Sequence, residues 1–243
     1  MTVVAVLATP PREGAVLPSL DETAPISAAE AAELYAAMLV DAMATVEASG
    51  GELLVNYRAV EDVPGESEPE AELRDLAEAA LATPEDARFE VQVGSTPAGR
   101  IGNTITHLLE REGATTAAVL RPEAPLVRRT TIDGAAMKLR RDEVVLGPGP
   151  DGRVYYAGFS EPIDFEDALS PPAVETLTAR ARAAGHGVAF ESLSPLAETA
   201  SDLHTLVPML RAREHAGLPV PEATFATVDD FGLRIENEDV VRE

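Results

Sequence analysis

A chain of 243 residues with 45% apolar residues is long enough for one large domain, or for one domain with a structured tail. A formal net charge of −23 opposes binding to nucleic acid or to an anionic membrane, and the absence of cysteine excludes disulfides and thiolate chemistry. No apolar run approaches the roughly 20 residues of a membrane helix, and no signal peptide is recognisable. We therefore expect a cytoplasmic protein whose partners are neither nucleic acid nor membrane. The sequence leaves the oligomeric state open.

The acidic residues are spread along the whole chain rather than gathered in one tail. Of the 19 basic residues, only Lys138 is a lysine. A dispersed acidic excess is typical of a solvated surface suited to concentrated salt, because at about 1 M salt the screening length falls to about 3 Å and self-repulsion becomes tolerable. We therefore predict a protein from a high-salt organism. The alternative is an unusually acidic protein from an ordinary medium.

Short β-branched runs alternate with longer alanine-rich amphipathic segments along the chain. The first strand is expected at 2–7, and it is ended by Pro10 and Pro11. Ser27 and Glu30 then form a capping-box pattern at the start of a helix that ends at Gly50. Further strands are expected at 52–57, 88–93, 115–120, 143–146, 154–159 and 187–191. Further helices are expected at 71–81, 99–111, 132–140, 172–184 and 200–215.

This alternation predicts a three-layer α/β domain with a mostly parallel sheet and helices on both faces. The pattern breaks near Gly217, so we expect residues 1–216 to form this domain and residues 217–243 to form a C-terminal appendage. In such sheets ligands bind beyond the carboxyl ends of the strands. The loops where function is expected therefore follow Leu7, Leu120, Leu146 and Glu191.

Three glycines, Gly147, Gly149 and Gly152, have the spacing of a dinucleotide-binding loop. That loop must lead from a strand into the first turn of a helix. Here prolines occupy the spacing, and another strand is expected from Val154. We interpret the segment as a tight turn between two strands.

Carboxylates follow two of the predicted strands at the edge where ligands are expected. Glu123 comes shortly after the strand that ends at Leu120, and Glu198 and Asp202 follow the strand that ends near Glu191. Converging carboxylates could hold a Mg²⁺ that bridges nucleotide phosphates. In a chain with 42 acidic residues, chance placement is the alternative. The long loop from Ala8 to Leu20 is either a ligand loop or an ordinary irregular connection.

Two stretches carry a resemblance to a known family, Ala29–Asp41 (AEAAELYAAMLVD) and Val144–Gly158 (VVLGPGPDGRVYYAG). The second is similar to the family segment V-x-G-P-x-x-D-G-G-Y-Y-L-x-G. Weaker support comes from Gln92-x-Gly94 followed by Gly99-Arg100. From about residue 1 to residue 206 the chain resembles the glycosyltransferase-like proteins often found beside radical-SAM genes, which share the GT-A fold of nucleotide-diphospho-sugar transferases. The archaeal guanylyltransferases that act on 2-phospholactate are more distantly similar.

The resemblance implies a transferase that takes a nucleotide-activated small-molecule donor together with Mg²⁺ or Mn²⁺. The family motif G-x-D-x-P aligns with residues 121–125, and D-V-D-x-P-x-D-L aligns with residues 196–203. The aligned metal ligands are Glu123 and Glu198, each in place of an aspartate, and Glu can ligate Mg²⁺ if the site absorbs its extra methylene. Asp151 is the candidate catalytic residue, positioning the acceptor or the donor sugar. The candidate phosphate-binding residues are Arg12, Gly14, Arg100 and Arg153, the last in place of a family glycine.

The first loop departs most from the family pattern F-A-K-x-P-x-x-G-x-V-K-T-R-L. Its three basic positions, expected to face the phosphates, are Thr9, Leu17 and Ser19 here. At about 1.5–3 kcal/mol for each charged hydrogen bond, losing three costs about 5–9 kcal/mol, or about 10³–10⁶ in affinity. Arg12 could recover part of this loss.

Three functions remain open on the sequence. The first is a divergent, metal-dependent glycosyltransferase-like enzyme. The second is a non-catalytic binding or partner protein that retains the fold, which the loss of the three basic positions favours. The third is a nucleotidyltransferase on the same fold. The replacement of aspartate by glutamate, rather than by alanine, favours a surviving metal site.

Overall fold

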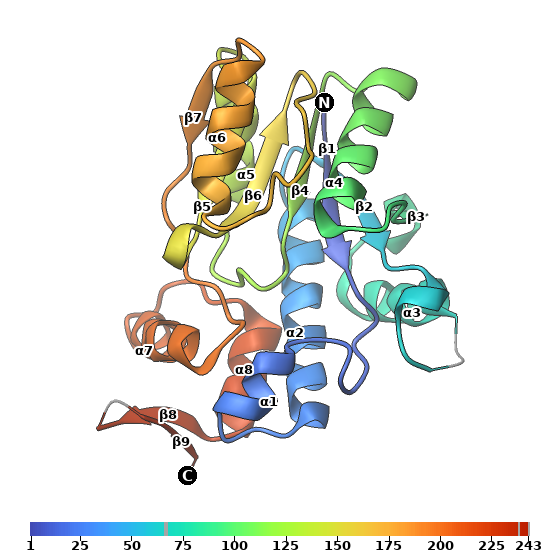
Figure 1. The fold of residues 1–243 in the computed structure, drawn as a ribbon. Coiled ribbons are helices and arrows are strands. Elements are labelled where there is room, and N and C mark those ends of the chain that lie inside the picture. Colours follow the sequence, from blue (N-terminus) through green and yellow to red (C-terminus); the bar gives the residue numbers. More distant parts are fainter. Residues whose placement is uncertain (66–67, 238, 243) are drawn as a thin grey trace.

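A computed structural model describes residues 1–65, 68–237 and 239–242, and it arranges them in three layers around a seven-stranded sheet (Figure 1). The strand order is β3-β2-β1-β4-β6-β5-β7, and only β6 runs antiparallel to its neighbours within this sheet. The expected mostly parallel α/β architecture is therefore confirmed. The strands are β1 (Thr2–Ala8), β2 (Glu52–Tyr57), β3 (Arg88–Val91), β4 (Thr116–Leu120), β5 (Val144–Pro148), β6 (Val154–Phe159) and β7 (Val188–Phe190).

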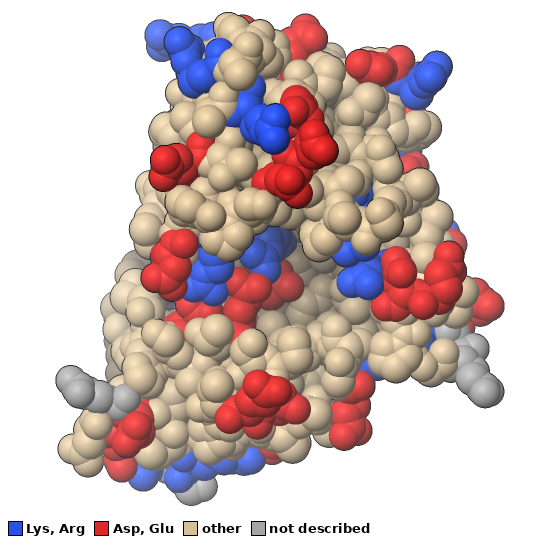
Figure 2. Space-filling model, viewed as in Figure 1, with Lys and Arg blue, Asp and Glu red and all other residues tan. Residues whose placement is uncertain are grey.

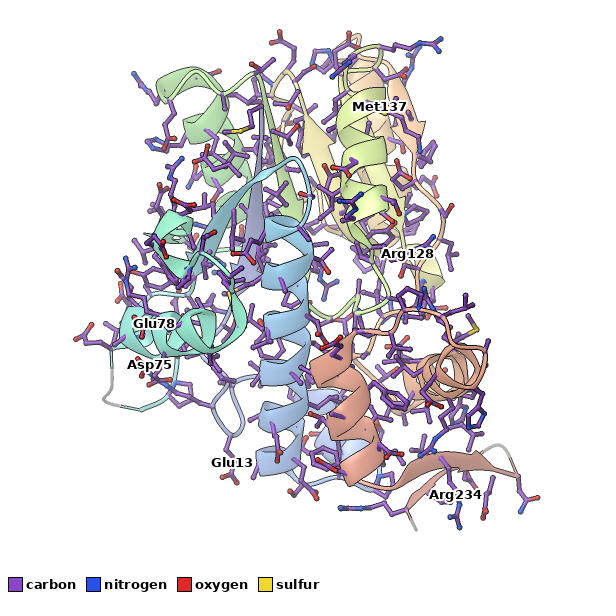
Figure 3. The ribbon with its side chains drawn as sticks, turned by 180° about the vertical axis from the view of Figure 1, so that it is seen from behind. Glu13, Asp75, Glu78, Arg128, Met137 and Arg234 are labelled. Atoms are coloured by element: carbon purple, nitrogen blue, oxygen red, sulfur yellow. The ribbon has the colours of Figure 1, made fainter. Side chains whose placement is uncertain are left out.

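Helices cover both faces of the sheet. Figure 1 shows α4 and α6 in front of it, and Figure 3 shows α2 and α5 on the opposite face. The helices are α1 (Pro18–Thr23), α2 (Ala28–Glu47), α3 (Pro69–Ala80), α4 (Pro97–Thr106), α5 (Arg129–Lys138), α6 (Ala173–Ala183), α7 (Ala200–His215) and α8 (Glu222–Asp230). A π-helical turn, His107–Arg111, continues α4. The helix expected at 132–140 begins three residues earlier, because apolar periodicity marks where α5 becomes buried rather than where it starts.

Strand β1 supplies side chains to two separate cores. Val4 and Val6 belong to the cluster that includes the apolar stripe of α2, while Val3 and Ala5 pack in the cluster that includes Ile105 of α4. Successive side chains of a strand point to opposite faces, so a strand buried on both sides must be apolar throughout. The capping box predicted for α2 is confirmed: the backbone nitrogen of Ser27 donates to Glu30 (2.8 Å), and that of Glu30 donates to Ser27 Oγ (3.3 Å).

The glycine-rich segment forms the turn between β5 and β6, as interpreted from the sequence. A short 3-10 turn, Pro150–Gly152, links the two antiparallel strands. Gly152 has φ +72°, and a Cβ there would lie 2.5 Å from Pro172 Cβ. A Cβ on Gly147 would lie 2.5 Å from the ring of Tyr155. These glycines therefore allow close packing.

The segment after residue 216 packs against α2 through α8, and it continues into the antiparallel ribbon of β8 (Leu233–Glu236) and β9 (Asp239–Arg242). Asp41 of α2 accepts hydrogen bonds from the backbone nitrogens of Ala223 (3.2 Å) and Thr224 (2.7 Å) and from Thr224 Oγ1 (2.6 Å). Asp41 thus caps the first turn of α8 from a neighbouring helix. Val228, Phe231 and Leu233 join the core around α2.

Replacing Asp41 with alanine should lower the free energy of unfolding by about 2–3 kcal/mol, since it leaves the donors at the start of α8 without their charged acceptor. Urea unfolding followed by circular dichroism measures this change. Glu33→Ala, on the exposed side of the same helix, is the matched control and should change stability by less than about 0.5 kcal/mol. Equal effects of the two substitutions would contradict this role of Asp41.

Acidic side chains are spread over the surface that Figure 2 shows, and Asp75 and Glu78 project outward from α3 in Figure 3. None of the helices in the described part of the chain is long and apolar enough to cross a membrane.

Raising KCl from about 0.1 M to about 2 M should raise the melting temperature by about 5 °C or more, because salt screens the repulsion among surface carboxylates. Differential scanning calorimetry measures the shift. A neutral osmolyte at the same osmolality separates screening from hydration effects. A melting temperature that stays constant or falls in KCl would contradict salt adaptation.

Candidate active site

A cavity of about 460 Å³ opens where the carboxyl ends of β1, β2 and β4 meet the β5–β6 turn. Figure 2 shows the hollow near the middle of this face, with basic side chains on both sides. This is the sheet edge at which ligands were expected. The polar side chains that line it include Thr9, Arg58, Gln92, Arg100, Arg121, Glu123, Asp151 and Arg153.

One wall of the cavity carries Arg58, just after β2, and Arg100, in the first turn of α4. Arg100 is only 9% exposed, and its Nη1 contacts the carbonyl oxygen of Gly94 at 3.4 Å. Burial lowers the pKa of Arg100, and the nearby charge of Arg58 lowers this pKa further. No carboxylate of the described residues forms an ion pair with Arg100. The charge of Asp62, whose carboxylate lies 3.7 Å from Arg58 Nε, partly opposes this lowering of the Arg100 pKa, so the wall holds a buried cation without an ion pair of its own among the described residues.

The loop before α4 brings this helix end close to the sheet. Thr96 caps the helix, with its Oγ1 accepting from the nitrogen of Gly99 at 3.0 Å. Gly94 has φ +140°, and a Cβ there would lie 2.9 Å from the nitrogen of Arg100. Only glycine allows this close approach. The first turn of α4 also lines the cavity through Pro97 and Ala98, so its positive dipole end lies beside the two arginines.

The opposite wall is a network of ion pairs. Arg121 Nε lies 3.4 Å from Glu123 Oε2, and a terminal nitrogen of Arg121 pairs with Glu198 Oε1. Arg153 Nη1 lies 2.9 Å from Glu198 Oε2 and donates to Asp202 Oδ2 at 2.9 Å. Both oxygens of Glu198 are thus occupied by guanidinium groups, and Glu123 lies against one of them.

Burial and pairing act against each other on these carboxylates. Burial raises the pKa of Glu123, and the charge of Arg121 only partly opposes this rise. Burial also works to raise the pKa of Asp202, but Arg153 and the backbone nitrogen of Glu198 more than offset it, so the pKa of Asp202 is lowered. Asp202 therefore remains ionised and holds Arg153 in place.

Four of the seven residues predicted for the site line the cavity, and a fifth, Glu198, contacts one of them. Glu123, Arg100 and Arg153 line the cavity, and Asp151 lies on its lining with its side chain 88% exposed and 3.5 Å from Arg153. Glu198 is not on the lining itself but contacts Arg153.

Arg12 and Gly14 lie outside the cavity lining. Arg12 pairs with Glu72 of α3, with 2.8 Å between Nη2 and Oε1, and therefore anchors the first loop to that helix. Gly14 is an exposed turn residue with φ +73° and open space around it. Of the three positions that are basic in the similar family, Leu17 is buried in the core and Ser19 is exposed, whereas Thr9 lines the cavity.

Arg58 and Arg121 also line the cavity but are not among the residues predicted for the site. Both directly follow a predicted strand, Arg58 after Tyr57 and Arg121 after Leu120. A basic residue at the carboxyl end of a parallel strand was thus the signal that could have identified them.

The residues expected to hold Mg²⁺ or Mn²⁺ do not fit a divalent cation as they are arranged. A cation between Glu123 and Glu198 would compete with the guanidinium of Arg121 for the same oxygens. Among the described residues, one group has potential ligand atoms within 4.8 Å of one another, formed by Glu90, His107 and Glu112. It lies outside the cavity lining, and Arg88 pairs with both of its glutamates.

Comparison with known proteins shows the fold. No protein-family profile matches the chain, and no curated protein is detectably similar in sequence. The crystal structure of a candidate nucleotide-diphospho-sugar transferase from Desulfovibrio desulfuricans G20 is similar, with a TM-score of 0.76 at 18% identity over 94% of each chain. A cytidylyltransferase from Leptospira borgpetersenii has a TM-score of 0.53 at 8% identity, also over 94% of each chain. The chain therefore has the fold of the nucleotide-diphospho-sugar transferases.

Replacing Asp202 with asparagine should lower the free energy of unfolding at pH 7 by about 2 kcal/mol, because Arg153 loses a charged partner. The pKa of Asp202 is lower in the folded state, so its stabilisation is fully present above the unfolded value of about 3.9 and is lost as the pH falls through the folded value. The difference between the two proteins should therefore shrink below about pH 4. Urea unfolding between pH 7 and pH 2.5 measures it, and a difference that does not depend on pH would contradict the pairing.

Proposed function

We propose that the cavity binds the diphosphate of a nucleotide-activated small molecule, and that the protein is a divergent transferase of a sugar or a nucleotidyl group. The observation that carries this proposal is the buried Arg100, with Arg58 beside it and the first turn of α4 behind it. A buried guanidinium without a carboxylate partner is costly, and an anionic ligand would supply the missing charge. Planar guanidinium groups match phosphate oxygens in pairs.

Either kind of transfer leaves a diphosphate group behind. In glycosyl transfer an acceptor hydroxyl attacks the anomeric carbon and gives up its proton to solvent, while the bond from that carbon to the phosphate oxygen breaks and the nucleoside diphosphate leaves with the bonding electrons. In nucleotidyl transfer a substrate oxygen attacks the α-phosphorus of a nucleoside triphosphate, and pyrophosphate leaves. Arg58 and Arg100 would neutralise and orient the departing group in both cases. The cavity volume of about 460 Å³ falls within the range of small-molecule sites.

The second wall would contact the part of the ligand that lies beyond the diphosphate. Asp151 lies at the rim, at the turn between β5 and β6, where its exposed carboxylate could accept a hydrogen bond from an acceptor hydroxyl. Thr9, directly after β1, lines the cavity with its polar side chain. The chemistry proposed here lies in positioning and charge neutralisation rather than in covalent catalysis.

A nucleotide that occupies the cavity should stabilise the protein by about 2.7 kcal/mol at 100 times its Kd. A thermal-shift panel in high salt with CTP, GTP, UTP, ATP, UDP-glucose and GDP-mannose measures this. Arg100→Gln should weaken the binding of any stabilising nucleotide by about 10- to 100-fold, as expected for the loss of one charged hydrogen-bonding group. Arg128→Gln is the control, because Arg128 is exposed and lies outside the cavity lining (Figure 3).

If no nucleotide in the panel stabilises the protein, the proposed function is wrong. The proposed function is also wrong if Arg100→Gln and Arg128→Gln bind the stabilising nucleotide equally well. Nucleotide binding without release of a nucleotide product in any acceptor mixture would favour the non-catalytic binding or partner protein over the transferase.

A further inference from the structure

We propose that Arg121 and Arg153 take the place of a divalent cation in this cavity, so that the protein binds a phosphate-containing ligand without metal. The inference rests on the proposed function for the identity of the ligand, but the contacts between arginines and carboxylates do not depend on which ligand binds. Three carboxylates, from Glu123, Glu198 and Asp202, converge at the end of the sheet where α7 begins. Among the residues that the structure describes, the cations in contact with them are the guanidinium groups of Arg121 and Arg153.

The contacts show that these arginines occupy the carboxylates rather than merely lying near them. Arg121 pairs with Glu198 through a terminal nitrogen, while its Nε lies 3.4 Å from Glu123 Oε2, an ion-pair distance at which this buried oxygen accepts no hydrogen bond. Arg153 bridges Glu198 and Asp202, with hydrogen bonds of 2.9 Å to each from its Nη1. A metal ion would link carboxylates from separate loops; here Arg121 links Glu123 to Glu198, and Arg153 links Glu198 to Asp202 at the start of α7.

The two arginines are themselves firmly held. The side chains of Arg121 and Arg153 are 27% and 23% exposed. Arg153 Nε also donates to the carbonyl oxygen of Pro150 at 3.1 Å, which fixes the plane of its guanidinium. A guanidinium stays protonated at any pH at which the protein is folded, so it does not dissociate as a metal ion does. The charge at this wall is therefore permanent.

The consequence for ligand binding is a cavity with arginines on both walls. Arg100, which forms no ion pair among the described residues, lines one side together with Arg58, which lies 3.7 Å from Asp62, and Arg121 and Arg153 line the other side. A diphosphate between the walls meets the charge of Arg100 on one side and, on the other, guanidinium groups whose charge is already matched by Glu198 and Asp202. Because Mg²⁺ in solution neutralises a nucleotide's phosphates, metal should not strengthen binding at such a site.

The first test compares nucleotide affinities by isothermal titration calorimetry in excess EDTA and in saturating Mg²⁺, for every nucleotide that stabilises the wild-type protein. We expect the Kd in EDTA to be equal to that in Mg²⁺ or lower. A Kd about tenfold or more higher in EDTA would overturn the inference while leaving the proposed function intact. Absence of binding in both conditions would instead contradict the proposed function, and the second test would still decide the inference.

The second test needs no nucleotide. Titration with Mn²⁺ followed by electron paramagnetic resonance should show that Arg121→Gln with Arg153→Gln binds Mn²⁺ about tenfold or more tightly than the wild-type protein, because the carboxylates are released. Adding Glu198→Gln should abolish this gain. Arg128→Gln with Arg140→Gln removes the same charge from exposed positions and controls for the acidic surface.

Mn²⁺ binding by the double variant that is no tighter than that of the exposed-site control would overturn the inference. Wild-type Mn²⁺ binding that Glu198→Gln removes would also overturn it. Circular dichroism checks that the double variant is folded. If it is not, Arg153→Gln alone is used, with Arg128→Gln as its control and the same two contradicting outcomes.

Discussion

The ion-pair network of Arg121, Arg153, Glu198 and Asp202 is the interaction on which the arrangement of the site depends. It joins the end of β4 and the β5–β6 turn to the first turn of α7. Asp202 also accepts hydrogen bonds from the backbone nitrogens of Glu198 and Thr199, each at 3.0 Å, so the same carboxylate caps α7 and holds Arg153. Partly buried charges of this kind are stable only when they are paired. Removing any one of them leaves its partner as an unpaired, partly buried charge, which is strongly destabilising.

The two walls of the cavity differ in the state of their charges. One wall has its arginines matched by carboxylates, and the other has Arg100 without such a match. The chain as a whole carries −23, so an anionic ligand is repelled by most of the surface and attracted only locally. Salt screens the long-range repulsion more than the contacts inside the cavity. An acidic protein can therefore hold an anion when its arginines are placed within one partly closed pocket.

The sequence predicts the layers of this fold well and the partners within the site poorly. The alternation of strands and helices, the Ser27 capping box and the turn at Gly152 are local patterns, and the structure confirms each of them. The pairing of Glu198 with Arg121 joins residues 77 positions apart, so it depends on how the loops meet at the sheet edge. The position of Arg12 depends similarly on α3, whose Glu72 binds it away from the cavity. Of the two arginines that pair with Glu198, Arg153 was among the predicted site residues and Arg121 was not.

The most direct test of this account is a crystal structure of the protein grown with a stabilising nucleotide and Mn²⁺, with diffraction data collected at the manganese absorption edge. The account predicts phosphate oxygens within hydrogen-bonding distance of Arg58 and Arg100, and no anomalous peak between Glu123 and Glu198. A manganese ion bound between those two glutamates, with Arg121 displaced, would contradict the replacement of the metal by arginine. Phosphates bound elsewhere on the protein would contradict the assignment of the site itself.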